Sequence, residues 1–264
     1  MYSTKYHKPA SIADATAALA AGEDATILAG GQTLLATMKQ HLASPSDLVD
    51  IRAIDGMSGI SADGNVLTIG AAATHNAVAS SAAVRDVCPA LADLASGIGD
   101  PAVRNVGTIG GSVANNDPAA DYPAAMLALG ATIVTNTREI AADDFFEGLF
   151  STALEDGEII TAVKITAPAK AAYAKFPQPA SLFALVGVFV ADGAGGVRVA
   201  VTGAGEDGVF RQGAMETALG ANWSAGALEG VAASQEGLMS DMHGAADYRA
   251  HLIAVMAKRA VSAA

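Results

Sequence analysis

The chain of 264 residues contains a single cysteine, Cys88. One thiol cannot form an intrachain disulfide, a cysteine-rich zinc site or an iron–sulfur cluster held by this chain alone. Any redox chemistry must therefore come from an organic cofactor or from a partner protein. For Cys88 itself, the expected role is that of a buried, unreactive side chain.

Positive charge and long hydrophobic runs are also scarce. The chain has 15 Lys and Arg against 27 Asp and Glu, which gives a net charge of −12 that disfavours nucleic acid and anionic lipid as partners. Its longest apolar run, residues 182–191, is far shorter than the roughly 20 residues that span a bilayer. No hydrophobic stretch follows the first residues, so we expect no signal peptide, no transmembrane segment and a cytoplasmic location.

The hydrophobic content is high at 52%, whereas aromatic residues make up only 5%, so small aliphatic side chains dominate a globular chain. The first half alternates between strand and helix patterns. Residues 167–171 interrupt both patterns with proline and small side chains, and we therefore predict two domains, residues 1–168 and 172–264. The expected helices cover residues 11–21, 34–38, 89–96 and 121–130, with two more near the C-terminus. The expected strands cover residues 26–28, 48–51, 66–70, 131–136, 158–166, 183–191 and 197–202.

Two glycine-rich segments, residues 28–34 and 105–112, lie about eighty residues apart. Each carries paired glycines, Gly30-Gly31 and Gly110-Gly111, which allow a positive φ angle and a close approach of the backbone to a bulky anion. A helix pattern follows each pair, and helix N-termini offer unpaired N–H groups. A single Gly-Gly turn is weak evidence of a ligand, but two such turns flanked by threonine indicate a diphosphate bound from two sides.

A third glycine segment, residues 203–208, matches the dinucleotide-binding fingerprint and follows a predicted strand. Glu206 and Asp207 lie inside the loop that would hold the pyrophosphate, where two carboxylates would repel it. We therefore predict an exposed loop between a strand and a helix here. The five histidines lack metal-ligand spacing, and structural or surface roles are expected for them.

The paired glycine segments, together with Arg104 and Leu35 beside them, resemble the flavoprotein (medium) subunit of molybdenum hydroxylases. That family includes the medium subunits of aerobic carbon monoxide dehydrogenases and of bacterial xanthine-dehydrogenase-type enzymes. The likeness covers essentially the whole chain, and its other segments are residues 6–9, 100–101, 175–181, 237–241 and 248–251. It implies an α+β fold: an FAD-binding domain of the vanillyl-alcohol-oxidase (PCMH) type in two α/β subdomains, followed by a small C-terminal α+β domain. Benzoyl-CoA-type relatives carry an additional cysteine-bearing insertion, and the single Cys88 excludes that branch.

The resemblance also implies a set of FAD contacts. The full set is Leu28, Ala29, Gly30, Gly31, Gln32, Thr33, Leu34, Ile98, Thr108, Ile109, Gly110, Gly111, Ser112, Asp121, Ile160 and Lys175. The two glycine segments correspond to the loops that bind the diphosphate. Asp121 corresponds to the acid of the sugar–ribityl region, although it is equally suited to cap the following helix. Ile160 supplies a backbone contact, Ile98 approaches the ring system, and Lys175 opens the C-terminal domain.

The function that the resemblance implies is electron transfer within a complex, with no catalytic side chain or metal on this chain. FAD belongs to this chain, molybdopterin to a large partner subunit and two [2Fe–2S] clusters to a small one, in a dimer of heterotrimers. The alternatives are a free-standing FAD-dependent oxidase or reductase of the same superfamily and a non-redox nucleotide-binding module. The oxidised substrate is chosen by the large subunit, so carbon monoxide, an N-heterocycle, a purine and an aldehyde all stay open, as does the electron acceptor.

Overall fold

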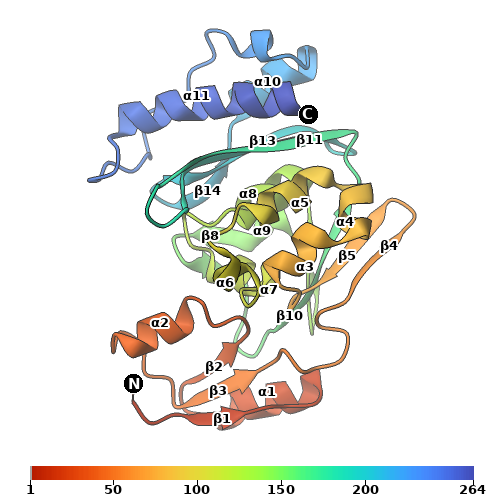
Figure 1. Cartoon of the computed structure of the whole chain (residues 1–264), viewed down its shortest axis with the longest axis vertical. Coiled ribbons are helices and arrows are strands. Elements are labelled where there is room, and N and C mark those ends of the chain that lie inside the picture. Colours follow the sequence, from red (N-terminus) through yellow and green to blue (C-terminus); the bar gives the residue numbers. More distant parts are fainter. Residues whose placement is uncertain (1) are drawn as a thin grey trace.

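The computed structural model describes residues 2–264, arranged in three stacked layers (Figure 1). The lowest layer in Figure 1 is a parallel three-stranded sheet of order β1-β3-β2 with helices α1 and α2. Its elements are β1 (Lys5–His7), α1 (Ile12–Ala21), β2 (Ala25–Leu28), α2 (Leu34–Lys39) and β3 (Asp47–Asp50). Ser11 begins α1 by accepting a hydrogen bond from the Asp14 amide, so the helix predicted over residues 11–21 is confirmed.

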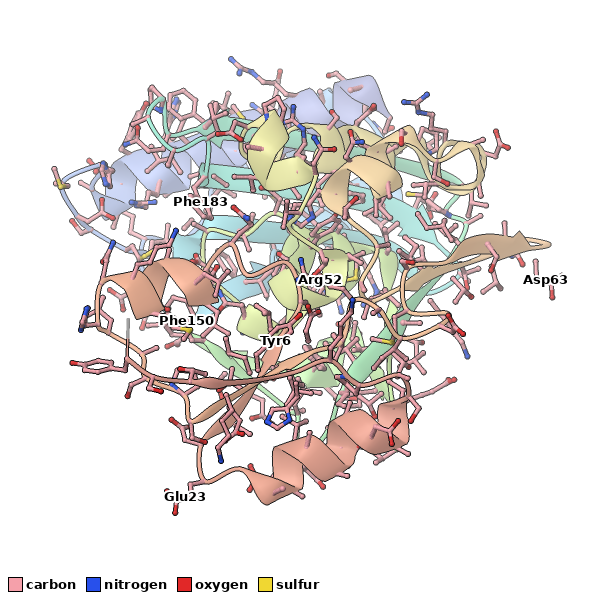
Figure 2. The ribbon with its side chains drawn as sticks, turned by 60° about the horizontal axis from the view of Figure 1, so that its bottom comes forward. Tyr6, Glu23, Arg52, Asp63, Phe150 and Phe183 are labelled. Carbon is pink, nitrogen blue, oxygen red and sulfur yellow. The ribbon has the colours of Figure 1, made fainter. Side chains whose placement is uncertain are left out.

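Asp50 links the central strand of this sheet to one edge strand. Its carboxylate accepts a hydrogen bond from the Tyr6 hydroxyl at 2.6 Å, and Arg52 donates to both of its oxygens. Figure 2 shows Tyr6 and Arg52 close together on the side of the layer that comes forward. The Tyr6 hydrogen bond links β1 to β3, and the bidentate pair with Arg52 fixes the orientation of the carboxylate that accepts this bond.

The middle layer is an antiparallel sheet of order β4-β5-β10-β6-β7 with helices around it. Its strands are β4 (Ile60–Asp63), β5 (Val66–Gly70), β6 (Thr132–Thr135), β7 (Glu139–Ala141) and β10 (Ile160–Thr166), and the hairpin β8 (Phe146–Gly148) and β9 (Ser151–Thr152) lies beside it. The helices are α3 (His75–Ser80), α4 (Ala82–Val87), α5 (Pro89–Ser96), α6 (Pro101–Arg104), α7 (Ile109–Asn115), α8 (Tyr122–Leu129) and α9 (Ala142–Phe145). Cys88 is buried here, which raises the pKa of its thiol to about 11, in agreement with an unreactive side chain.

The upper layer is an antiparallel sheet of order β11-β12-β13-β14. Its elements are β11 (Lys170–Pro177), β12 (Ala184–Gly193), β13 (Gly196–Gly205), β14 (Gly208–Arg211), α10 (Gly213–Ala221), a 3₁₀ turn (Ala225–Leu228) and α11 (Ala246–Ala263). In Figure 1, α10 and α11 cover one face of this sheet, while α5 and α8 of the middle layer lie on the other side. Along β12, Val186 and Val188 belong to the core beneath α11, whereas Phe189 belongs to the core of the middle layer. Burial on both faces explains why this strand is a continuous apolar run.

Two predictions need correction in this layer. The strand β11 was not predicted, because its small residues follow a proline and their pattern is typical of a linker. The segment 203–208 is no loop between a strand and a helix, since the turn at Glu206 and Asp207 joins β13 to β14 in a hairpin. A Cβ on Gly205 would lie 2.5 Å from the Gly208 carbonyl oxygen, so the glycine there serves the hairpin.

Arg249 of α11 joins the helix to the upper sheet. The residue is 2% exposed, and its guanidinium donates to the carbonyl oxygens of Leu185 and Gly203, at 2.8 and 2.7 Å. It also forms a bidentate pair with Asp241. Among residues 2–264, none of the helices combines the length and the hydrophobicity that a membrane span requires.

Replacing Arg249 by leucine should lower the free energy of unfolding by about 3 kcal/mol, because two buried carbonyls and a carboxylate lose their donor. Denaturant titration of the purified chain measures this loss. Arg259→Leu, on the exposed side of the same helix, is the matched control and should change the free energy of unfolding little. Equal stability of the two variants would contradict the assigned role of Arg249.

Candidate functional site

A cleft of about 890 Å³ lies between the lower and middle layers and reaches the loop before β12. Both predicted glycine segments contribute to its wall. Phe150, Leu182 and Phe183 also line it, and each side chain is partly exposed. Figure 2 shows Phe150 and Phe183 on the same side of the molecule. Phe150 and Leu182 adopt positive φ angles of 53° and 63°, which are uncommon for residues other than glycine.

The first glycine segment presents unused backbone donors. No carbonyl or side chain of residues 2–264 accepts a hydrogen bond from the amides of Gly30, Gly31, Gln32 or Thr33. Gly31 has φ of +69°, which glycine adopts without strain. Successive amides around such a residue form a concave donor group, and this geometry binds anions. We call residues 30–33 the amide loop.

The second glycine segment uses its amides within the protein. The amides of Ile109 and Gly110 donate to the carbonyl oxygens of Ala73 and Ala71, and that of Gly111 donates to the Thr108 hydroxyl. A Cβ on Gly110 would lie 2.5 Å from the Cβ of Ala71. Gly110 is therefore required for packing α7 against the end of β5, whatever the cleft binds.

The two glycine segments touch directly. A Cβ on Gly30 would lie 2.5 Å from the Val106 carbonyl oxygen and 2.6 Å from the Gly107 Cα. Any larger residue at position 30 must push the lower and middle layers apart. This contact brings the amide loop against the segment that leads into α7.

Asp121 lies on the cleft wall and is 4% exposed. The Tyr173 hydroxyl donates to its Oδ1 at 2.5 Å, and Lys175 Nζ lies 3.0 Å from the same oxygen. Burial raises the pKa of the Asp121 carboxyl, although Lys175 and Tyr173 oppose this shift. The carboxylate does not cap α8, because no helix amide donates to it. The capping role considered for Asp121 is therefore wrong, and both of its partners come from β11.

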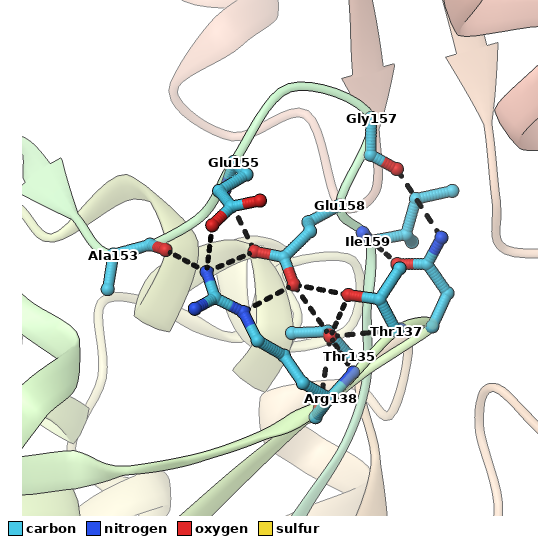
Figure 3. A network of polar contacts seen from close by, with 9 residues as sticks. Thr135, Thr137, Arg138, Ala153, Glu155, Gly157, Glu158 and Ile159 are labelled. Carbon is cyan, nitrogen blue, oxygen red and sulfur yellow. Dashed lines mark hydrogen bonds and ion pairs between the residues drawn. The ribbon is translucent and has the colours of Figure 1, made fainter.

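Glu158 organises another part of the cleft wall, residues 154–160, through the network in Figure 3. Arg138 donates to both of its carboxylate oxygens, at 2.9 and 2.8 Å. The hydroxyls of Thr135 and Thr137 and the amide of Glu155 also donate to it. These donors, with Arg138 foremost, hold the pKa of Glu158 well below its usual range.

The cleft wall is acidic, with five carboxylate residues at positions 117, 121, 155, 156 and 158. No lysine or arginine of residues 2–264 lines it. An anionic ligand therefore meets backbone amides, hydroxyls such as those of Thr33 and Ser112, and the imidazole of His75, but no permanently charged cation.

Most of the predicted contact residues meet in this one cleft. Leu28, Ala29, Gly30, Gly31, Gln32, Thr33, Leu34, Ile98, Thr108, Gly110, Gly111, Ser112, Asp121 and Ile160 line it. Ile109 is fully buried behind the wall. Lys175 does not line the cleft itself but contacts two of its wall residues, Asp121 and the carbonyl of Leu182, and also donates to the carbonyl of Gly97. The segment 203–208 contributes nothing to the wall.

Sequence reasoning missed His75, Phe150, Phe183 and the segment 154–159. One sequence feature could have indicated Glu158. It is an acidic residue at the start of an apolar strand, and a carboxylate buried there needs hydrogen-bond donors close by. Within residues 2–264, no group of three His, Cys, Asp or Glu side chains is arranged to hold a metal ion.

Comparison with known proteins assigns this architecture. The model of the FAD binding domain in molybdopterin dehydrogenase matches residues 2–168, and that of the CO dehydrogenase flavoprotein C-terminal domain matches residues 171–264. The chain belongs to this family of flavoproteins.

The family relatives include chains that match this one over nearly their whole length. The carbon monoxide dehydrogenase medium chain of Hydrogenophaga pseudoflava is 35% identical, over 98% of this chain and 96% of the relative. The nicotine 6-hydroxylase medium subunit of Paenarthrobacter nicotinovorans is also 35% identical, over 97% and 95%. Reconstituted CO dehydrogenase from Oligotropha carboxidovorans superposes with a TM-score of 0.90 at 34% identity, over 99% of this chain and 97% of the other. Quinoline 2-oxidoreductase from Pseudomonas putida 86 gives 0.89 at 31% identity, over 100% and 97%. The predicted fold class is confirmed.

The residues of this flavoprotein's cleft fit FAD in chemical terms. The amide loop offers four donors for an anionic diphosphate, and the buried Asp121 offers an acceptor for hydroxyls. Apolar side chains at Ile98, Leu182 and Phe183 offer a surface for a flat ring system. The cleft is also large enough for a cofactor.

Replacing Glu158 by glutamine should reduce the melting temperature of this flavoprotein by several degrees near pH 7, because a charged acceptor of five hydrogen bonds is lost. Glu158 has a lowered pKa when folded, so its stabilisation is complete above the ordinary glutamate range. It declines as the pH falls toward the lowered value.

Thermal melts between pH 7 and pH 3 should therefore show a difference between wild type and variant that shrinks at low pH. Glu155→Gln, on the same segment with a largely exposed carboxylate, is the control. A difference that stays constant with pH would contradict the assigned role of the ionised Glu158.

Proposed function

We propose that this chain is the flavoprotein electron-transfer subunit of a molybdenum hydroxylase. FAD bound in the cleft would receive electrons from [2Fe–2S] clusters of a small partner subunit and pass them to an external acceptor. The single observation that carries the proposal is the amide loop, whose four unused donors lie in the wall of a cofactor-sized cleft. The medium-chain relatives support the role as a subunit.

In this proposal, each part of the wall has a task. The amides of residues 30–33 bind the diphosphate, and hydroxyls of Thr108 and Ser112 border it. Asp121 accepts hydrogen bonds from the ribityl hydroxyls. Tyr173 and Lys175 position Asp121, because both bond to its Oδ1. FAD itself supplies the redox chemistry, while the chain binds it, orients it and limits its contact with water.

The proposal extends to the assembly. A large molybdopterin subunit would oxidise the substrate, and the complex would be a dimer of heterotrimers in the cytoplasm. The name of the Hydrogenophaga relative points to carbon monoxide as a candidate substrate, whereas the Paenarthrobacter relative points to an N-heterocycle. Since the large subunit would select the substrate, the proposed role of this chain is the same for either substrate.

Gly31→Ala should weaken FAD binding by about tenfold or more, because a Cβ at a positive φ angle displaces the amide loop. Gly64→Ala is a matched control, since Gly64 also has a positive φ, of 57°, and lies in open space at the turn from β4 to β5. Flavin fluorescence quenching measures the affinity of each refolded apoprotein. Equal FAD affinity of the two variants would show that the diphosphate lies elsewhere.

The FAD-loaded chain alone should leave its flavin oxidised when mixed with carbon monoxide, purines or N-heterocycles under anaerobic conditions. The proposed route delivers electrons through a partner subunit, and one cysteine cannot hold two iron–sulfur clusters. Stopped-flow absorbance of the flavin measures this, with dithionite as a positive control for reducibility. Rapid bleaching by a substrate would favour the free-standing oxidase instead.

A further inference from the structure

Within residues 2–264, His75 is the one side chain of the cleft wall that can gain a positive charge, because the wall otherwise combines five carboxylates with neutral residues. A diphosphate carries two negative charges at neutral pH. If neutral amides alone bind the diphosphate among the carboxylates, its two negative charges have no cationic partner in the wall. A protonated imidazole would supply one.

His75 is placed beside the contact between the glycine segments. Its amide donates to the Gly107 carbonyl oxygen at 2.9 Å. A Cβ on Gly107 would lie 2.6 Å from His75 Nε2, and Gly30 meets the same Gly107 from the amide loop. The imidazole, Gly107 and the amide loop are therefore adjacent parts of one wall.

The imidazole also has unused hydrogen-bonding capacity. Neither ring nitrogen has a hydrogen-bond partner within residues 2–264. Nδ1 is fully enclosed by the protein, whereas Nε2 is not, and the residue as a whole is 5% exposed. The ring packs against Tyr122, with 5.4 Å between ring centroids. Polar nitrogen atoms this deep in a protein normally have partners, so Nε2, the ring nitrogen that is not enclosed, is the atom of His75 that a ligand in the cleft can bond.

We propose that His75 is a further ligand of the FAD diphosphate and that its imidazole takes up a proton from solvent as the diphosphate binds. This inference rests on the proposed function and names the group that partly neutralises the diphosphate. The reaction is a simple protonation, in which neutral imidazole and one proton give imidazolium beside the anion.

The surroundings of His75 favour its neutral form in the protein alone. Burial, with a smaller contribution from the charge of Arg104 on α6, lowers the pKa of His75 to about 4. The phenol of Tyr122 faces the ring from α8, and its own pKa is raised by burial. No charged group of α4 or α5, which also pack on α3, shifts the imidazole within the described residues. A nearby dianion would raise the pKa toward neutrality, so FAD affinity should increase as the pH falls through the raised value.

The test compares the full-length apoprotein with His75→Gln, using FAD fluorescence quenching at pH 8 and pH 6. For wild type, the FAD dissociation constant should fall about threefold or more between the two pH values. His75→Gln should bind FAD more weakly than wild type at pH 6 and lose most of the pH dependence of the dissociation constant. The pH dependence that remains in the variant comes from the carboxylates of the cleft. Calorimetry in two buffers of different ionisation enthalpy should detect proton uptake with wild type and little with the variant.

His251→Gln, an exposed position on α11, is the matched control and should behave as wild type. Riboflavin, which lacks phosphate, should bind wild type and His75→Gln alike, and unequal binding would assign His75 a structural role and overturn the proposal. FAD binding by wild type without proton uptake would overturn it as well, whether or not the variant folds, while leaving the proposed function intact. Failure of wild type to bind FAD at any pH would overturn both.

Discussion

The contact of Gly30 with Gly107 is the constraint on which the cleft depends. The lower and middle layers come from separate parts of the chain, and they meet at Gly30 and Gly107, neither of which carries a Cβ. The same contact sets the amide loop against the segment leading into α7, so donors and wall are positioned together. A binding site built in this way needs no permanently cationic side chain, since the backbone supplies its hydrogen-bond donors.

Two buried carboxylates, Glu158 and Asp121, fix the rest of the wall, and their surroundings shift their pKa values in opposite directions. Five donors surround Glu158 and keep it ionised, so it serves as an anchor for residues 154–160. Asp121 is buried with fewer donors, and burial dominates its pKa despite Lys175. Because its two partners come from β11, the docking of the upper sheet determines how Asp121 is held. The C-terminal domain thus contributes to the site without supplying most of its wall.

Local patterns in the sequence predicted much of the fold. Ser11 before α1, the proline that begins α5 and the apolar run of β12 each carry a signal within a few residues. The strand β11 could not be predicted, because its pairing with β12 is a tertiary property and its residues are small. Both glycine segments were found, but their contact with each other involves residues 77 apart. His75 and Phe183 reach the cleft only through packing between layers, which no local pattern records.

Everything proposed for this cleft depends on the amide loop binding the FAD diphosphate. Two-dimensional NMR of the ¹⁵N-labelled chain during titration with FAD tests it most directly, because each amide reports separately. We expect the amides of residues 30–33 to show large shifts and to become protected from solvent exchange on FAD binding. Unchanged signals from these four amides, with shifts concentrated in residues 203–208 instead, would contradict it.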